Sequence, residues 1–346
     1  MNQQSGLYKK LRILEVKEEV KDFKVITFEA GHGITYKAGQ YLTLVRLENG
    51  SELRRSYSIT SSPVLNEPLS IGVKRVENGV FSRALVDYAR PGDELITTGS
   101  GGLFVLPEDL SPQQLLFFFA AGSGITPIFS LLKTALHSYP FLPAVLVYSN
   151  ASEEKASFLK ELQEMQAAFP NRFRLELLFS NAADLLRARL HRDLIFSMLN
   201  QHLQGNDTLY YLCGPERYMR LCTFTLQEFG VPATQIRKEN FYTGHLVRRD
   251  ASPPDKESHP VLIRMQNTTS TITVHYPDSI LHAAQKAGLV LPYSCEAGRC
   301  GNCVARCVSG RVWHSYNDVL TEKELQQGLV LTCVGHPVGG NVVLEI

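Results

Sequence analysis

Four cysteines in the last part of the chain carry its most distinctive chemistry. Cys295, Cys300 and Cys303 lie in the segment Cys-Glu-Ala-Gly-Arg-Cys-Gly-Asn-Cys, and Cys333 follows at a distance. Three thiols and two glycines in so short a segment are atypical of a hydrophobic core. Thiolate sulfur is a preferred ligand of soft and borderline metal ions. These four residues therefore predict a metal centre.

The spacing of the four thiols indicates which centre they form. A C-x4-C-x2-C segment followed by a distant cysteine is typical of a plant-type [2Fe-2S] cluster, in which four thiolates hold two irons. Gly298 and Gly301 give the loop the backbone freedom to surround a cluster and to direct amides at its sulfurs. The pattern thus predicts a protein that transfers single electrons.

Two other metal sites share part of this pattern. Cys300-x2-Cys303 followed by Cys333-x2-His336 is similar to a structural zinc pattern, and its second half is also half of a Rieske signature. Neither pattern uses Cys295, and the sequence has no Cys-x-His pair for a Rieske site. The cluster is the preferred interpretation. A zinc-stabilised binding module without redox function is the alternative.

Composition limits the classes of protein to which the chain can belong. With 346 residues the chain is too long for one ordinary core, and we expect two or three domains. Its 35 basic and 34 acidic residues give no net field for nucleic acid or an anionic membrane. Seven cysteines, an odd number, do not indicate a secreted disulfide framework. Because thiolate ligands need a reducing compartment, we expect a cytoplasmic protein, and Met1 to Lys10 does not have the pattern of a signal peptide.

Residues 1–110 have the pattern of a small antiparallel β-barrel. Short runs rich in Val, Ile, Thr and Tyr, such as Lys24 to Glu29 and Gln40 to Arg46, alternate with turn sequences. A further strand contains Arg55-Ser56-Tyr57-Ser58. Alternation puts Arg55 and Tyr57 on one face, where they can pair with a phosphate and stack on a flat ring. On local grounds alone, a basic strand with an ordinary half-buried tyrosine is the simpler interpretation.

Residues 111–243 alternate between strand and helix patterns. The expected strands are Leu115–Phe119, Ala144–Tyr148, Phe173–Phe179 and Thr208–Cys213. Amphipathic helices separate them: we expect one with Pro127 at its first position, and one capped by Ser152 with an apolar stripe from Phe158 to Met165. This alternation predicts an α/β domain with a doubly wound parallel sheet, whose ligands bind beyond the carboxyl ends of the strands.

Two turns of this domain follow strands directly. Gly122-Ser123-Gly124-Ile125-Thr126-Pro127 could bring a pyrophosphate close to backbone amides at a helix N-terminus, although a tight structural turn explains it equally well. The same glycines and proline divide the uncharged stretch Leu115 to Leu132, so we expect no membrane span. Cys213-Gly214-Pro215 places a thiol at the rim of the same edge, although a lone buried cysteine is more often a small hydrophobic residue.

The remainder of the chain divides into a linker and a small third domain. Residues 244–259 are polar and proline-containing, which is typical of a linker. Residues 260–346 begin with two strand patterns, and a helix follows with Ser279 as N-cap and Gly288 just after its end. The cysteine segment comes next. A bound cluster would help to stabilise so small a core.

In chain order these motifs resemble those of one known family. Arg55-Ser56-Tyr57-Ser58 resembles the R-x-Y-S flavin motif of the ferredoxin-NADP reductase family, Gly79-Val80-Phe81-Ser82 its second flavin segment, and Gly122 to Pro127 its G-x-G-x-x-P nucleotide turn. Cys213-Gly214-Pro215 resembles its nicotinamide motif, and the four cysteines match a plant-type ferredoxin. With the ferredoxin domain at the C-terminus, the chain resembles the reductase components of bacterial oxygenases.

The resemblance implies roles in binding FAD. Tyr57 packs on the isoalloxazine ring, Ser58 forms a hydrogen bond near flavin N5, and Arg55 contacts the pyrophosphate. The second flavin segment, which holds the pyrophosphate through its amides and serine, consists of Gly79, Val80, Phe81 and Ser82. Phe241, in Glu239-Asn240-Phe241, falls where such reductases place an aromatic residue beside the flavin.

The resemblance also assigns the nucleotide and cluster residues. The turn that binds NADPH or NADH contains Gly122, Gly124, Thr126 and Pro127. Cys213, followed by Gly214 and Pro215, lies near the nicotinamide, so that Ser58 and Cys213 are the candidate catalytic residues. Cys295 and Cys300 hold one iron and Cys303 and Cys333 the other, in a domain of the α+β, β-grasp type.

These roles imply an NAD(P)H-dependent reductase that passes electrons through FAD and a [2Fe-2S] cluster to a separate oxygenase or another electron-accepting protein. A stand-alone flavin or quinone oxidoreductase is the alternative. Ser149-Asn150 lacks the acid that favours an unphosphorylated ribose, and Arg187 and Arg189 are available for a 2′-phosphate, so we slightly favour NADPH over NADH. Both arginines would equally suit a solvated helix face.

Overall fold

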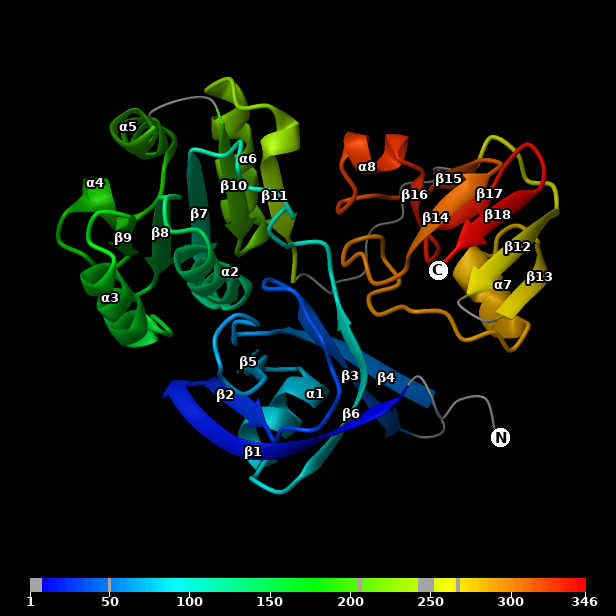
Figure 1. The fold of residues 1–346 in the computed structure, drawn as a ribbon, viewed down its shortest axis with the longest axis horizontal. Helices are drawn as coiled ribbons and strands as arrows, with labels where there is room; N and C mark the ends of the chain where they lie inside the picture. The colour runs from blue at the N-terminus through cyan, green and yellow to red at the C-terminus, as the bar shows by residue number, and fades with distance from the viewer. Residues whose placement is uncertain (1–7, 49–50, 204–206, 242–251, 266–267) are drawn as a thin grey trace. The chain divides into compact units, whose positions relative to one another are not determined.

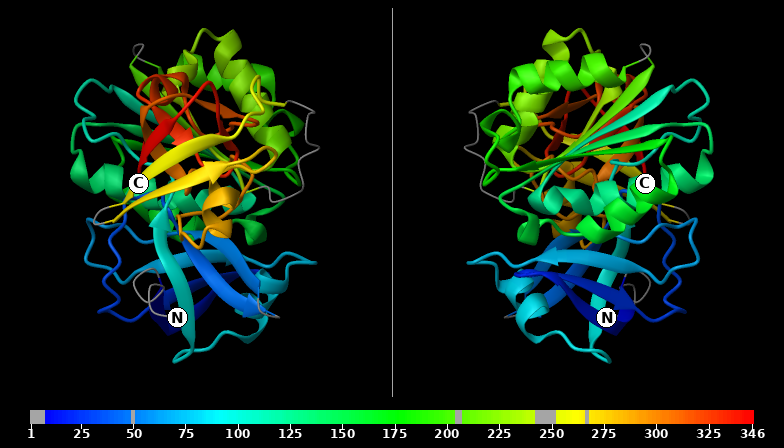
Figure 2. Two further views of the ribbon diagram at one scale, coloured as in Figure 1. Left: turned by 90° about the vertical axis from the view of Figure 1, so that its right-hand side faces the viewer. Right: turned by 90° about the vertical axis from the view of Figure 1, so that its left-hand side faces the viewer.

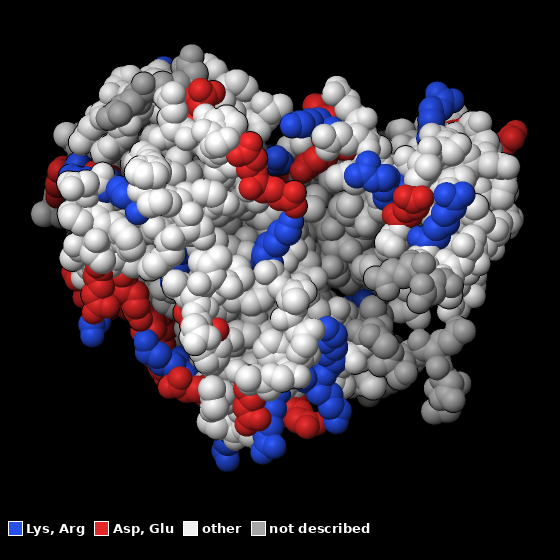
Figure 3. Space-filling model, in the orientation of Figure 1, with Lys and Arg blue, Asp and Glu red and all other residues white. Residues whose placement is uncertain are grey.

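The computed structural model describes residues 8–48, 51–203, 207–241, 252–265 and 268–346. The chain divides into two compact units, of which the first spans residues 6–242 and the second contains residues 243–346 (Figure 1). The first unit holds two of the three expected folds, and the second holds the cysteine segment. On the face drawn in Figure 3, side chains of both charge signs are scattered, in keeping with the formal net charge of +1.

The N-terminal part of the first unit is the expected antiparallel barrel. Six strands pair in the order β4-β3-β6-β1-β2-β5. They are β1 (Lys9–Val20), β2 (Phe23–Phe28), β3 (Tyr41–Glu48), β4 (Ser51–Ser58), β5 (Ser70–Lys74) and β6 (Glu94–Gly101). A bridge between Ile59, directly after β4, and Ile71 of β5 joins the two ends of the sheet. Helix α1 (Val80–Arg83) and a π-helical turn (Ala84–Tyr88) lie between β5 and β6.

The second part of this unit is a parallel five-stranded sheet in the order β11-β10-β7-β8-β9. Its strands are β7 (Leu115–Ala121), β8 (Ala144–Asn150), β9 (Phe173–Phe179), β10 (Thr208–Cys213) and β11 (Ile236–Glu239). The strand order reverses between β7 and β10, where a doubly wound sheet opens a crevice for ligands. The expected fold class is therefore confirmed for this domain.

Helices cover both faces of the parallel sheet (Figure 2). They are α2 (Ile125–Ser138), α3 (Leu159–Ala168), α4 (Leu185–Ala188), α5 (Arg192–His202) and α6 (Glu216–Glu228). Successive residues of β7 point to opposite faces: Phe118 packs in the core beneath α2 and α3, and Phe117 packs in the core beneath α5 and α6. Burial on both faces explains why this strand has a continuous apolar sequence.

Two expected helix starts were wrong. The chain enters α2 through a short 3-10 turn (Gly122–Gly124), so Pro127 is the third residue of the helix and not the first. Ser152 precedes only a 3-10 turn (Glu153–Lys155), and α3 begins after Phe158. Phe158 has a left-handed backbone (φ 60°), so a helix that started at Ser152 could not continue through it into α3. Its ring stacks on Phe129 at 4.4 Å, so tertiary packing overrides the local preference.

The second unit contains a mixed five-stranded sheet in the order β13-β12-β18-β14-β16, with a separate β15-β17 pair. Its strands are β12 (His259–Met265), β13 (Thr268–Val274), β14 (Val304–Ser309), β15 (Val312–His314), β16 (Leu329–Leu331), β17 (Gly335–Pro337) and β18 (Val342–Glu345). The helices are α7 (Ile280–Lys286) and α8 (Glu322–Gln326). Ser279 caps α7 by accepting from the His282 amide, and Gly288 follows with φ 75°, as the sequence predicts.

Within the described ranges, no helix is both long and apolar enough to cross a membrane. The uncharged stretch from Leu115 to Leu132 instead forms β7, the 3-10 turn and the first half of α2.

Glycine substitutions test the packing between the barrel and α2. Gly39 (φ +88°) has no room for a side chain, because an added Cβ would lie 1.9 Å from the Phe104 carbonyl oxygen and 2.9 Å from Leu131 of α2. Gly33 (φ +62°) has open space around it. We expect Gly33→Ala to lower the free energy of unfolding by about 1–2 kcal/mol through its backbone alone. Gly39→Ala should cost about 1–3 kcal/mol more through overpacking.

Thermal and denaturant unfolding followed by circular dichroism measure this difference between two residues of similar backbone conformation. Equal destabilisation by the two substitutions would show that the close approach at Gly39 does not constrain the unit.

Candidate functional site

The pairing of two short strands brings distant cysteines together. Cys303 directly precedes β14 and Cys333 comes two residues after β16, and these strands pair with Val304 opposite Leu331. The Thr332 amide donates to the Cys303 carbonyl oxygen at 3.1 Å. As a result the sulfur atoms of Cys303 and Cys333 lie 3.2 Å apart. The sequence could not show this proximity, because it depends on the register of β14 and β16.

The loop between α7 and β14 is shaped by residues with a left-handed backbone. Gly298 and Gly301 have φ values of 69° and 73°. A Cβ on Gly298 would lie 2.8 Å from the carbonyl oxygen of Tyr316, so this position also needs glycine for packing. The Ala297 amide donates to the Cys295 sulfur at 3.4 Å. The loop therefore wraps around its cysteines and directs backbone donors at sulfur, as expected for a cluster loop.

Hydrogen bonds among the four thiols divide their pKa values: they raise the pKa of Cys300 and Cys333 and lower the pKa of Cys295 and Cys303. Hydrogen bonds from the thiols of Cys300 and Cys333, and then from two loop amides, lower the pKa of the Cys295 thiol to about 2 against the opposing effect of burial. A hydrogen bond from Cys333 is the main cause of a lowered pKa at Cys303. Thiolates are the form that binds metal. All cysteines are free of disulfides.

No group of three or more His, Cys, Asp or Glu side chains in the described part of the chain is spaced to hold a metal ion. The fit to a cluster therefore rests on the donor set itself: four free thiols, of which Cys303 and Cys333 are in contact, and a loop amide directed at the Cys295 sulfur. Four thiolate donors are the set that a plant-type [2Fe-2S] cluster requires.

The turn after β7 joins two strands of the parallel sheet closely. Gly122 has a left-handed backbone (φ +53°), and a Cβ on Gly124 would lie 2.1 Å from the carbonyl oxygen of Cys213 at the end of β10. This contact holds the carboxyl ends of β7 and β10 together at the switch point, where α2 begins. The Thr126 hydroxyl donates to the Ser123 carbonyl oxygen at 2.8 Å, so it stabilises the turn itself.

Cys213 is the last residue of β10, at the carboxyl edge of the sheet, and its side chain is fully buried. Burial, reinforced by the charge of Glu239, raises the pKa of the Cys213 thiol well above its usual range. Glu239 is placed there by the parallel pairing of β10 with β11. The thiol is therefore neutral and is not an ionised nucleophile. Phe241 follows β11 and is 41% exposed.

Two tyrosines at the carboxyl edge of the parallel sheet were not among the residues expected from the sequence. The Tyr218 hydroxyl of α6 donates to the Ala120 carbonyl oxygen at 3.2 Å and accepts from Ser149. The Tyr148 hydroxyl donates to the Ser157 carbonyl oxygen at 3.2 Å. Both tyrosines tie helices or loops to the carboxyl ends of β7 and β8. Tyr148 could have been noticed from its place at the end of a buried strand, but Tyr218 has no such signal.

The structure brings the two expected flavin segments together. Tyr57 of β4 and Phe81 of α1 have ring centroids 6.0 Å apart. Arg55 is exposed on the same strand, whereas Ser58 is buried at its end. Ser82 is also buried, and its hydroxyl accepts from the Val76 amide and donates to the Gly79 carbonyl oxygen. Burial raises the pKa of the Tyr57 phenol, so the ring stays neutral.

The barrel and the nucleotide turn meet through β5. A Cβ on Gly72 of β5 would lie 2.4 Å from Thr126, the residue that stabilises the turn. The neighbouring residue Ile71 is bridged to Ile59, which directly follows Ser58. The expected flavin strand and the expected nucleotide turn are thus separated by one strand within a single compact unit.

Arg187 and Arg189 differ in their surroundings. Arg187 pairs with the buried carboxylate of Glu176 at 2.5 Å, and Arg174 pairs with the same carboxylate at 3.1 Å. Arg189 is exposed. Arg187 is thus already paired with a carboxylate, whereas Arg189 does not occur among the described ion pairs.

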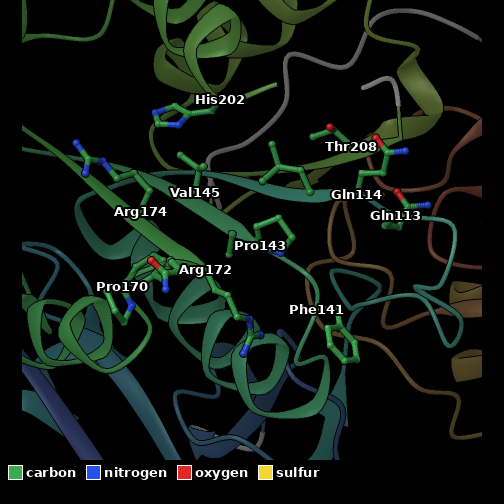
Figure 4. A pocket seen from close by; sticks show the side chains of 14 residues that line it. Gln113, Gln114, Phe141, Pro143, Val145, Pro170, Arg172, Arg174, His202 and Thr208 are labelled. Carbon is green, nitrogen blue, oxygen red and sulfur yellow. The ribbon is translucent and has the colours of Figure 1, made fainter. Parts of the chain in front are cut away.

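One cavity lies away from these motifs, at the amino edge of the parallel sheet (Figure 4). Its volume is about 640 Å³, and its lining includes His202, Phe141 and the first residues of four strands, which are Leu115, Ala144, Phe173 and Thr208. The nucleotide turn lies at the carboxyl edge of the same sheet. This cavity is therefore not the expected nucleotide site.

Comparisons with known families divide the chain in the same order as its motifs. Residues 10–106 match the oxidoreductase FAD-binding domain, residues 118–223 the oxidoreductase NAD-binding domain, and residues 263–338 the 2Fe-2S iron-sulfur cluster binding domain. Phthalate dioxygenase reductase, a solved structure with 22% identity, shares the fold with a TM-score of 0.60 over 98% of each chain. Together these define an oxidoreductase with FAD, NAD and 2Fe-2S domains.

Relatives that match along nearly the whole chain show to which group of oxidoreductases it belongs. A component of the 1,2-phenylacetyl-CoA epoxidase of Escherichia coli (strain K12) is 31% identical over 97% of this chain and 96% of its own length. The ferredoxin reductase component of 3-ketosteroid-9-alpha-monooxygenase from Mycolicibacterium smegmatis is 30% identical over 96% and 95%. The chain belongs to this family of oxygenase reductase components. The expected class of NAD(P)H oxidoreductase with FAD and a [2Fe-2S] cluster is confirmed.

Cysteine substitutions within the second unit test the ligand set. We expect Cys303→Ser to abolish cluster binding, because it removes one of four thiolate ligands. Cys307→Ser should retain the cluster, since the Cys307 thiol contacts only backbone carbonyl oxygens of its own turn among the contacts described. Iron and acid-labile sulfide per FAD, measured on the purified proteins, distinguish the two. Equal iron content would contradict the assignment of Cys303.

Proposed function

We propose that this chain takes hydride from NAD(P)H at the junction of its first two domains and delivers electrons singly to a partner oxygenase. The observation that supports this most directly is the contact of Thr126, in the nucleotide turn, with Gly72 of β5. The residue before Gly72, Ile71, forms a β-bridge with Ile59, which directly follows Ser58. Hydride transfer needs its two partners in near contact, and this junction brings their expected binding segments together. We propose domain limits of 1–110, 111–243 and 260–346, with a linker at 244–259, of which residues 244–251 lie outside the described residues.

The proposed roles of the flavin residues follow from their positions. Tyr57, neutral and backed by Phe81, provides a flat apolar surface for the isoalloxazine ring. Arg55, exposed on the same strand, and the amides of the segment from Gly79 to Ser82 hold the pyrophosphate. Ser58 offers its hydroxyl near flavin N5. FAD, when bound, accepts a hydride and releases electrons one at a time.

The proposed nucleotide-binding residues hold and orient the dinucleotide, and they transfer no proton. Gly122 and Gly124 bring backbone amides at the start of α2 to the dinucleotide phosphates, in the turn completed by Thr126 and Pro127. Cys213 stays neutral and places no charge beside the nicotinamide. Its neighbours Gly214 and Pro215 line the same edge. Phe241 covers the flavin from the end of β11.

We propose an oxygenase as the partner, acting on phenylacetyl-CoA or another aromatic compound. The match to a component of a phenylacetyl-CoA epoxidase supports this choice. Other matching reductases serve a ketosteroid monooxygenase and a glycine betaine monooxygenase, so the substrate is determined by the partner and not by this chain. Because its thiolate ligands need a reducing compartment, we propose a cytoplasmic location.

Electron flow through the cluster distinguishes a component reductase from a stand-alone one. Purified protein should contain FAD and iron, and anaerobic NAD(P)H should reduce both chromophores. In Cys303→Ser, NAD(P)H should still reduce FAD, whereas substrate turnover by the partner oxygenase should fall at least about a hundredfold, because the single-electron route is interrupted. Undiminished oxygenase turnover by this variant would instead favour a flavin or quinone reductase that bypasses the cluster.

The choice of nucleotide is tested at Arg189. We expect kcat/KM to be higher with NADPH than with NADH. Arg189→Ala should lower kcat/KM for NADPH about tenfold, as expected for the loss of one charge-assisted hydrogen bond, and leave the value for NADH unchanged. A wild-type preference for NADH would refute the proposed 2′-phosphate contact.

A further inference from the structure

Helix α2 has an unusual polar stripe where it faces the barrel. Ser130 is fully buried and Thr134 is 8% exposed, although the helix is otherwise largely apolar. Lys133 lies between them in sequence, with a side chain only 11% exposed. Positions separated by three and four residues share one helix face, so the three side chains form a continuous strip. Buried polar groups of this kind need partners to offset their desolvation.

The partners lie in the loop that directly follows the flavin strand. The Ser130 hydroxyl donates to the Ser61 carbonyl oxygen at 2.6 Å. The hydroxyls of Ser62 and Thr134 are 2.7 Å apart. Both serines of the loop are fully buried, and they come only a few residues after Ser58. The helix that starts at the nucleotide turn is thus hydrogen-bonded to the chain that leaves the flavin strand.

An ion pair strengthens this connection. The Lys133 ammonium donates to Glu67 Oε1 at 2.5 Å and lies 4.7 Å from the centre of the Phe129 ring. The same carboxylate oxygen accepts from the backbone amide of Ser62. Glu67 therefore holds both the helix and the loop. Removing the charge of Lys133 would leave a carboxylate without its counter-ion at a site that is partly shielded from water.

A second contact holds the same helix beside the polar strip. Phe158 precedes α3 with a left-handed backbone, and its ring lies between Phe129 of α2 and Phe23 of the barrel. Its amide donates to Glu19 Oε1 of β1 at 3.1 Å. A strained residue of this kind persists only where its surroundings determine its position strongly. The barrel thus holds α2 directly through the polar strip and indirectly through Phe158.

We propose that Lys133 and Glu67 are positioning residues that fix the nucleotide turn relative to the flavin strand for hydride transfer. Ion pairs that are partly shielded from water are often no more stabilising than apolar residues of similar volume, but in some proteins they select one arrangement of the groups around them. A reaction whose partners must approach to about 3–3.5 Å is sensitive to such an arrangement. The inference rests on the proposed function, because it concerns the same junction.

The test uses full-length protein with its cofactors. The variants are Lys133→Met, Glu67→Gln and the double substitution, which leaves neither charge without a counter-ion. Lys10→Met is the matched control, because Lys10 forms a similar pair with Glu94 at 2.9 Å, within the barrel and largely exposed. The measurements are the stopped-flow rate of flavin reduction at saturating NADPH, the Kd of NADPH, the long-wavelength charge-transfer absorbance, and amide hydrogen exchange of residues 122–128.

We expect flavin reduction at saturating NADPH to fall at least about tenfold in all three variants, since a displacement of 1 Å can cost about a hundredfold. The Kd of NADPH should change less than the rate. The charge-transfer absorbance should weaken, and exchange of residues 122–128 should quicken. The Lys10→Met protein should behave as the wild type.

The double substitution separates positioning from stability. If the pair is only structural, removing both charges together should restore the thermal midpoint and the reduction rate in parallel, and this result would overturn the proposal. Restored stability with a persistently slow rate supports it. A wild-type protein that neither NADPH nor NADH reduces would contradict the proposed function, whereas unchanged hydrogen exchange in the variants would contradict the role of the pair itself.

Discussion

The contact between the nucleotide turn and strand β5 is the constraint on which the first unit depends. Thr126 packs against Gly72 with no room for a side chain, and Gly124 packs equally closely on the Cys213 carbonyl oxygen. Through these two close contacts, the barrel and the strands β7 and β10 all meet at the nucleotide turn. Because hydride transfer tolerates little separation, the flavin and nicotinamide segments must belong to one compact body. The barrel and the parallel sheet meet this requirement.

The four cysteines proposed to hold the cluster depend on a different constraint. They all lie within the second unit, where the register of β14 and β16 brings Cys303 beside Cys333, and a glycine-containing loop carries Cys295 and Cys300. Single-electron transfer does not require the near contact that hydride transfer needs. A family that joins these two sites in one chain can therefore serve different oxygenases, as the range of its matching members shows.

Much of the fold could be predicted because its signals are local. The apolar run of β7, the turn from Gly122 to Gly124 and the cap at Ser279 depend on residues adjacent in sequence. The helix start expected at Ser152 was wrong, because Phe158 adopts a left-handed backbone to reach Phe129 and Phe23. Such long-range packing produces no periodic pattern of apolar residues in the sequence.

The sequence by itself indicated the chemistry: four thiols at cluster spacing, an Arg-x-Tyr-Ser strand that resembles a flavin motif, and a glycine turn after a buried strand. These are properties of residue type and short spacing. Only the tertiary structure decided that Cys213 is a buried, neutral thiol, and that Lys133 meets Glu67 across the junction. Burial and long-range pairing depend on how strands and helices pack, and residue order alone does not specify that arrangement.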